Sequence, residues 1–192
     1  MGYVIGEHPQ GFASRAGLRQ ALGYRTDERV CIATVGGSAV GSHLIERIIQ
    51  SYPLVRRELP ELRLIVVAGP RIDPLSLKVP RGVEVRAFVP DLDRHLAACD
   101  LAIVQGGLST CMELTAARTP FLYFPLKNHF EQNFHVAHRL DRYRAGTRMD
   151  FATATPELIA QAMLATLATP VAFRPVEADG AARAARLLAD LF

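Results

Sequence analysis

The residues best suited to chemistry lie in one stretch, residues 100–132, which reads DLAIVQGGLSTCMELTAARTPFLYFPLKNHFEQ. A short apolar run stops there at Gln105-Gly106-Gly107, and two residues without a Cβ let the backbone turn sharply and approach a ligand closely. Ser109 or Thr110 can then cap a helix that runs to about residue 117. The pattern predicts a strand, a bare loop and a helix whose first amides are open to an anion.

These residue types suit a nucleoside diphosphate. Its phosphates need backbone amides at a helix start, which Gly107, Ser109 and Thr110 can supply. Its ribose diol needs a carboxylate acceptor, and Glu113 lies one turn into the predicted helix. The alternative for Glu113 is a solvated helix residue without a ligand.

A second glycine loop, Gly36-Gly37-Ser38, follows the apolar run at residues 30–35. The two glycines leave room for a ligand, and the Ser38 hydroxyl offers a donor to negative oxygen at the start of the next helix. The alternative is a plain tight turn with a serine cap. The loop is not a Walker loop, because the lysine-serine ending is absent.

A third set of polar residues lies between residues 125 and 133 in the sequence PLKNHFEQN. Glu131 and Gln132 provide paired acceptors and donors of the kind that recognise the vicinal hydroxyls of a sugar. His129 can contact a sugar or a phosphate, or serve as a solvent-exposed or capping residue. His135 and His138 are three residues apart, but no third metal ligand has matching spacing.

The elements that would position these residues alternate between strands and helices. Strand-like apolar runs occupy residues 30–35, 62–68, 83–88, 101–104, 121–124 and 146–149, with helical patterns between them. This alternation predicts an α/β fold, a Rossmann-like parallel sheet of about six strands with helices on both faces. A ligand should bind outside the carboxyl ends of the strands, where the two glycine loops converge.

Four blocks of the chain resemble the donor-binding half of GT-B glycosyltransferases, closest to the branch with the peptidoglycan N-acetylglucosaminyltransferase and macrolide-type transferases. They are GGS at 36–38, FVPDLDRHLAACDLAIVQGGLSTCMEL at 88–114, PFLYFPL at 120–126 and HFEQN at 129–133. The blocks occur in the family's order and at about its spacing. The resemblance therefore implies one half of a GT-B fold.

The resemblance also implies a role for each part of the site. The donor diphosphate would contact Gly36, Gly37, Ser38, Gln105, Gly106, Gly107, Ser109 and Thr110, the base Phe88 and Val89, the ribose Glu113, and the transferred sugar His129, Glu131 and Gln132. Phe88 has an equal alternative as a core residue at a strand end. Many family members carry histidine at the position of Gln105, and glutamine cannot carry its positive charge.

The mechanism implied by the family is transfer of a hexose from a nucleotide sugar, with a UDP-sugar favoured, to an acceptor hydroxyl. Helix-end amides would stabilise the departing diphosphate, so we expect no cofactor and no metal. The family usually places the base that deprotonates the acceptor in its N-terminal half. We therefore assign no catalytic residue to this chain, and we expect it to bind donor but transfer little or nothing alone.

The same resemblance divides the chain into an interdomain linker with a short helix at residues 1–28, a nucleotide-sugar-binding domain at 29–175, and a C-terminal helix at 176–192. It implies a missing acceptor-binding half, either cut away or present as a separate chain, which would also carry any peripheral membrane association. The rival functions are a non-catalytic nucleotide-sugar-binding subunit acting with a partner chain, and a nucleotide-sugar epimerase.

Composition sets the outer limits. The chain has 192 residues, 49% hydrophobic and 21% charged, and its net charge of +3 is spread without a Lys/Arg block long enough for a nucleic-acid track. Cys31, Cys99 and Cys111 lie in or beside apolar runs, which predicts reduced core thiols of a cytoplasmic protein. No apolar stretch reaches the length of a membrane span, and the start lacks the build of a signal peptide.

Overall fold

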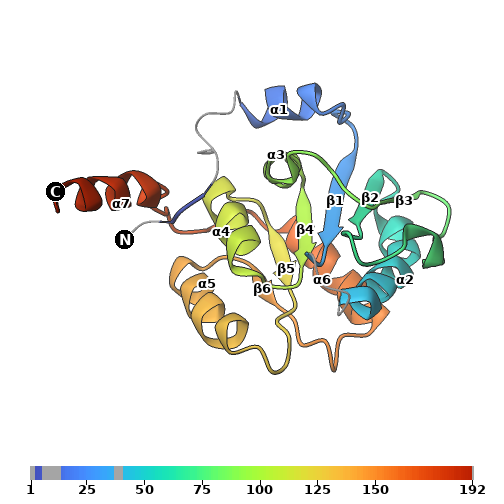
Figure 1. Ribbon diagram of the computed structural model, residues 1–192. Helices are drawn as coiled ribbons and strands as arrows, with labels where there is room; N and C mark the ends of the chain where they lie inside the picture. The colour runs from blue at the N-terminus through green and yellow to red at the C-terminus, as the bar shows by residue number, and fades with distance from the viewer. Residues whose placement is uncertain (1–2, 6–13, 37–40, 192) are drawn as a thin grey trace.

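The computed structural model describes residues 3–5, 14–36 and 41–191 of the chain (Figure 1). Their central feature is a six-stranded sheet in the order β3-β2-β1-β4-β5-β6, in which every neighbouring pair is parallel. The strands are β1 (Arg29–Thr34), β2 (Leu62–Val67), β3 (Val83–Arg86), β4 (Leu101–Val104), β5 (Phe121–Tyr123) and β6 (Thr147–Arg148). The predicted fold class and all six predicted strands are confirmed.

The sheet is buried on both faces because its central strands are apolar at nearly every position. Successive side chains point to opposite faces, so Cys31 and Ala33 of β1 join one core cluster while Val30 and Ile32 join the other. β4 is buried along its whole length in the same way.

One face is covered by α2 (Ser42–Glu58) and α6 (Pro156–Ala168), which pack against each other (Figure 1). In α2 the buried residues recur at helical spacing, with Ile45, Ile48 and Ile49 facing the sheet. α6 begins at a Thr155 cap followed by Pro156, as its sequence predicts, and the Thr155 hydroxyl accepts from the Leu158 amide at 3.3 Å.

In the described part of the chain, the other face is covered by four α-helices and one π-helical segment. They are α1 (Arg15–Ala21), α3 (Leu92–Ala98), α4 (Leu108–Ala117), the π-helix η4 (Glu131–Val136) and α5 (Ala137–Tyr143) that continues it. α1 and α4 both pack against α3, so α3 lies between them. A short 3₁₀ helix, η3 (Pro74–Ser76), lies in the proline-containing loop after β2.

The C-terminal helix α7 (Gly180–Ala189) extends away from the rest of the domain in Figure 1. Leu187 and Leu188 on this helix are 57% and 59% exposed. At its base, Val4 forms an antiparallel bridge with Asp179, and the buried Tyr3 ring packs edge-on against Tyr143. The expected boundaries at residues 28 and 175 stay predictions.

All three cysteines are free and buried, so the expectation of core thiols is confirmed. Burial raises the pKa of Cys99 and of Cys111 to about 12, and it raises the pKa of Cys31 as well. Since the thiolate is the reactive form, these side chains act as small apolar core residues.

Candidate functional site

The strand order reverses between β1 and β4, so the chain leaves these two neighbouring strands toward opposite sides of the sheet. Such a reversal opens a crevice at the carboxyl ends of the strands. Gly36 follows β1 with a φ of 70°, and Gly106 follows β4 with a φ of 89°. Both values are left-handed, so glycine is required at each loop by its backbone conformation.

Helix α4, which follows the Gly106 loop, is open at its start, but its N-cap residue differs from the prediction. Gly107 is the N-cap of α4, and in the described structure no side chain caps the helix. Ser109 and Thr110 lie inside the first turn instead, so the prediction that either one caps the helix is wrong. The first intrahelical bond runs from the Cys111 amide to the Gly107 carbonyl at 3.1 Å, which leaves the preceding amides available to an anion.

A hollow of about 530 Å³ lies between the end of β3 and the two helices α3 and α4. We call it the nucleoside-sized hollow. Phe88 and Val89 form part of its wall, Asp93 comes from α3, and Thr110 and Glu113 come from α4. Phe88 is 76% exposed whereas Val89 is buried, so the alternative of Phe88 as a core residue is wrong. The structure thus brings the predicted base and ribose residues to one hollow.

Glu113 is partly buried at this hollow and lies near a second carboxylate. Burial raises the pKa of Glu113 above its ordinary value, and the negative charge of Asp93 raises it further. A ligand that donates hydrogen bonds to the Glu113 carboxylate would relieve both effects.

A second hollow, about 170 Å³, lies directly over the ends of β1 and β4. We call it the central hollow. It is lined by Thr34, Val35, Gly36, Val104, Gln105, Gly107, Thr110 and Gln132. The hollow therefore combines four of the residues predicted to contact the diphosphate with Thr34 and Gln132. Thr110 also lines the nucleoside-sized hollow, so the two hollows are neighbours that share one wall residue.

A third hollow, about 550 Å³, lies beyond the ends of β4 and β5, and Gln105 joins it to the central hollow. Its polar groups include His43, Lys127, His129 and Asp150, while much of its wall is apolar. Of the residues predicted to contact a sugar, His129 lines this hollow.

The residues predicted to contact the sugar do not line one common hollow. Glu131 is exposed and, in the described part of the chain, lines none of these three hollows. Gln132 is buried and lines the central hollow. Ser109 is exposed at the start of α4 and likewise outside the three hollows as described. Gly37 and Ser38 lie outside the described residues.

Gln132 is held in place by the backbone of the preceding loop. Its Oε1 atom accepts from the Leu126 amide at 2.8 Å, and the neighbouring Asn133 side chain donates to the Leu126 carbonyl at 2.7 Å. Both residues belong to the π-helix η4, a form often found at functional sites. The side-chain oxygen of Gln132 is thus occupied, and its amino group is the part free for a ligand.

Sequence reasoning missed several residues that line the hollows. Thr34 resembles the last core residue of an apolar strand, and Asp93 resembles an ordinary residue in the first turn of a helix. His43 and Asp150 come from segments that had no predicted role. The one available signal was Thr34, a polar residue that ends a buried strand beside a glycine loop.

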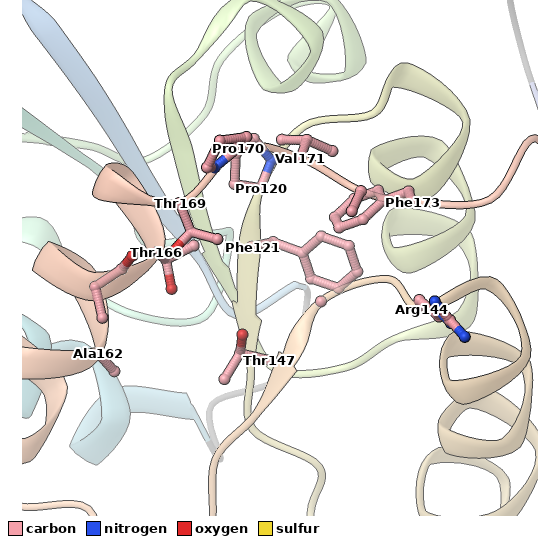
Figure 2. Close-up of a pocket in the computed structure, with 13 residues that line it drawn as sticks. Pro120, Phe121, Arg144, Thr147, Ala162, Thr166, Thr169, Pro170, Val171 and Phe173 are labelled. Carbon is pink, nitrogen blue, oxygen red and sulfur yellow. Dashed lines mark hydrogen bonds between the residues drawn. The ribbon is translucent and has the colours of Figure 1, made fainter.

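A further hollow lies at the opposite, amino edge of the sheet, beside Pro120 and the first residue of β5, Phe121 (Figure 2). It measures about 340 Å³, and Phe173 packs edge-on against Phe121 with their ring centroids 6.1 Å apart. Figure 2 shows proline, alanine, valine and phenylalanine side chains around it together with Thr147, Thr166 and Thr169, and Arg144 lies at one side. Its chemistry does not match a diphosphate, and it lies away from both glycine loops.

Residues 31–190 match the C-terminal domain of glycosyltransferase family 28. The chain belongs to this family. Its sheet and the crevice at the carboxyl ends of β1 and β4 are those of a C-terminal GT-B glycosyltransferase domain, so the resemblance seen in the sequence is confirmed.

Two relatives of this family 28 domain illustrate its range. An uncharacterized glycosyltransferase of Methanopyrus kandleri is 26% identical over 98% of this chain and 53% of its own length. The UDP-N-acetylglucosamine–N-acetylmuramyl-(pentapeptide) pyrophosphoryl-undecaprenol N-acetylglucosamine transferase of Carboxydothermus hydrogenoformans is 33% identical over 63% of this chain and 34% of its own length. The chain therefore spans about half or less of these relatives.

Among solved structures, the spinosyn rhamnosyltransferase complexed with thymidine diphosphate superposes with a TM-score of 0.60. The match covers 86% of this chain and 42% of that one at 24% identity, so it bears on the fold.

In the described part of the family 28 domain, no helix is long and apolar enough to cross a membrane. The same residues contain no cluster of three His, Cys, Asp or Glu side chains that could hold a metal ion.

Proposed function

We propose that this family 28 domain binds the nucleoside diphosphate part of a sugar donor, with UDP-sugars as the donor class. The observation that carries the proposal is the set of three neighbouring hollows along the carboxyl edge of the sheet. Thr110 joins the nucleoside-sized hollow to the central one, and Gln105 joins the central one to the third. Base and ribose, diphosphate, and sugar follow one another in the same order in a nucleotide sugar.

The chemistry of each hollow supports this assignment. Phe88 offers an exposed aromatic face to a base, and Glu113 offers a carboxylate to the ribose hydroxyls. The glycine loops and the open end of α4 suit the diphosphate. The third hollow, with His129 on its wall, has room for a hexose.

We propose UDP as the nucleotide because the Carboxydothermus relative is named for UDP-N-acetylglucosamine. The spinosyn enzyme was solved with thymidine diphosphate, so thymidine is the competing base. Titration calorimetry of this chain with UDP, TDP and GDP should show tightest binding to UDP. Tighter binding of TDP or GDP would support the donor site but show that its preferred base is not uracil. If none of the three bound, the proposal would be wrong.

The second part of the proposal concerns the reaction. We propose that the bound donor transfers its hexose to an acceptor hydroxyl only when an acceptor-binding domain or subunit supplies the other half of the cleft. This chain alone should bind UDP-N-acetylglucosamine or UDP-glucose. In its presence UDP should form from either donor no faster than in buffer without protein. Rapid release of UDP to added acceptors by this chain alone would contradict it.

The third part is metal independence. We propose that amides and neutral side chains hold the diphosphate without a divalent ion or other cofactor, since neutral donors can stabilise oxygen anions directly. UDP affinity should be equal in EDTA and in magnesium. A requirement for magnesium would show that the phosphates are held in another way.

A further inference from the structure

The hollow at the amino edge of the sheet differs in its lining from the donor crevice, and we call it the amino-edge hollow (Figure 2). Of its thirteen lining residues, four have polar or charged side chains, and the rest are glycine, alanine, proline, valine and phenylalanine. Its volume of about 340 Å³ lies near the lower end of the range of about 300 to 1,000 Å³ for pockets that bind small molecules. The amino-edge hollow therefore has the size and lining of a site for a small, largely apolar ligand.

The walls of the amino-edge hollow are held in place by contacts within the protein. Phe121 of β5 is fully buried, and Phe173, in the connector between α6 and α7, packs edge-on against it. Arg118 donates to the Phe173 carbonyl at 3.1 Å, and the Arg174 amide donates to the Tyr143 carbonyl at 2.8 Å. The connector is thus tied to both α4 and α5, so the hollow is formed by the fold without a ligand.

Arg144 carries the one charge among the described lining residues, and its position is unusual. It ends α5 in a left-handed conformation with a φ of 52°, where glycine is the usual residue. Arg118 ends α4 in the same conformation with a φ of 56°, but its guanidinium donates to the connector carbonyls. The Arg144 side chain is exposed and makes no hydrogen bond or ion pair within the described residues.

An unpaired cation beside an apolar hollow selects the chemistry of a ligand. Within the described residues the lining includes no carboxylate, and the Thr169 hydroxyl already donates to the Ala165 carbonyl at 2.7 Å. A guanidinium pairs with a carboxylate through two parallel hydrogen bonds. One guanidinium balances one negative charge, which favours a monocarboxylate over a phosphate. The apolar wall is covered best by a ligand whose body has no polar groups.

We propose that the amino-edge hollow binds a small monocarboxylate with an apolar body, of the class of medium-chain fatty acids. The carboxylate pairs with Arg144, and the apolar body packs against Phe173 and the alanines of α6. This site is at the opposite edge of the sheet from the donor crevice, so both can be occupied together. The inference does not rest on the proposed function.

Octanoate is the probe, because it remains monomeric at millimolar concentrations. Nuclear magnetic resonance of the nitrogen-15-labelled chain should show saturable shifts of the Gly146, Thr147, Thr166 and Val171 amide signals. Hexanoate should bind about tenfold more weakly, since it buries two fewer methylene groups. Octan-1-ol keeps the chain but not the charge, so it should bind about three- to fivefold more weakly, as expected for a partly exposed ion pair.

The charge is tested by Arg144→Gln, a change at an exposed side chain that makes no bond within the described protein. Octanoate should bind this variant about three- to fivefold more weakly, whereas octan-1-ol should bind it as it binds the parent chain. Arg142→Gln is the matched control, because it removes the same charge two residues away and Arg142 does not line the hollow. This control should bind both ligands like the parent chain.

The apolar part of the site is tested by Ala165→Leu, which places a larger side chain at the wall of the hollow without introducing a poor helix former. Octanoate and octan-1-ol should both bind about tenfold more weakly, because less apolar surface is left for them to cover. Ala168→Leu on an exposed position of the same helix, outside the lining, should bind both ligands like the parent chain.

Four results would overturn the proposal. Shifts that do not saturate, or that follow the exposed leucines of α7, would show that octanoate has no defined site in this hollow. Octan-1-ol that binds as tightly as octanoate would remove the preference for a carboxylate. Unchanged octanoate affinity in Arg144→Gln would remove the ion pair. Displacement of octanoate by UDP would place the acid in the donor crevice instead.

The two proposals can fail separately. If octanoate binds with the expected pattern while no nucleoside diphosphate binds, the amino-edge site is supported and the donor function is wrong. If UDP binds and octanoate does not, the donor function is supported and the amino-edge site is wrong.

Discussion

The two edges of the sheet differ in how many hydrogen bonds their buried polar side chains make within the protein. At the amino edge, the Asp100 carboxylate accepts from the Val30 amide at 2.8 Å and from Arg15, Arg19 and Arg29 at 3.0, 2.9 and 3.4 Å. At the carboxyl edge, the Thr34 hydroxyl and the Gln132 amino group have no acceptor within the described residues.

The difference separates polar groups that hold the fold from polar groups that are available to a ligand. Burial pushes the pKa of Asp100 upward, but the Val30 amide and the arginines outweigh it and hold that pKa below its ordinary value. Arg19 also donates to the Ala98 carbonyl, so the cluster joins α1 to the end of α3 and the start of β4. The Asp100 carboxylate accepts four hydrogen bonds in this cluster, so it has no acceptor capacity left for a substrate.

The largest expected effect comes from breaking the saturated edge. Asp100→Asn should lower the free energy of unfolding by about 2 to 4 kcal/mol, because it leaves the largely buried Arg19 without its charge partner. Urea unfolding would measure the loss. UDP affinity, measured well below the melting temperature, should stay unchanged because Asp100 is at the other edge.

The matched control is Asp27→Asn, which removes the partner of Arg25 in an ion pair whose side chains are 71% and 66% exposed. Exposed pairs contribute less than about 1 kcal/mol. If Asp100→Asn proved no more destabilising than Asp27→Asn, the claim that the Asp100 cluster stabilises the fold would be wrong.

The next effect concerns the carboxyl edge. Glu113→Ala should weaken UDP binding by about 1 to 3 kcal/mol, since the ribose hydroxyls would lose their charged acceptor. Unfolding stability should change little. Glu58→Ala, at the exposed end of α2, removes the same charge far from the hollows and should bind UDP like the parent chain. An unchanged affinity in Glu113→Ala would end the ribose role.

A smaller effect is expected from Phe88. Its ring is 76% exposed, so Phe88→Ala should leave the free energy of unfolding nearly unchanged and weaken UDP by about 1 kcal/mol through lost base stacking. Phe134→Ala is the matched control, because that ring is 62% exposed and lies outside the nucleoside-sized hollow. Pyrophosphate affinity should be the same in both variants, and equal UDP losses would argue against stacking on Phe88.

The smallest effect is a pH dependence. Because the pKa of Glu113 is raised, its carboxylate begins to take up a proton at a higher pH than an ordinary glutamate. Binding that uses the ionised form must then release this proton, so UDP affinity should fall as pH decreases. We expect the affinity of the parent chain to fall more than that of Glu113→Gln as the pH is lowered. If UDP affinity had the same pH profile in the parent chain and in Glu113→Gln, protonation of Glu113 would not control binding.

Much of the fold could be predicted from the sequence because each element carries a strong local signal. The apolar runs of β1 and β4 end at glycines whose left-handed backbone conformations only glycine adopts without strain. Thr155 and Pro156 mark the start of α6 by cap chemistry that acts within one turn. Such signals depend on neighbouring residues, so they survive without knowledge of the tertiary structure.

The grouping of side chains around the ligand crevice depended on the tertiary structure. Glu131 and Gln132 are adjacent in sequence, yet the π-helical turn exposes the first and buries the second against the Leu126 amide. Thr34 is a polar residue beside a glycine loop, but nothing in its own segment shows that residues of α4 and η4 line the same hollow. Whether a buried polar residue is paired is set by distant neighbours, and only the packed chain brings those neighbours together.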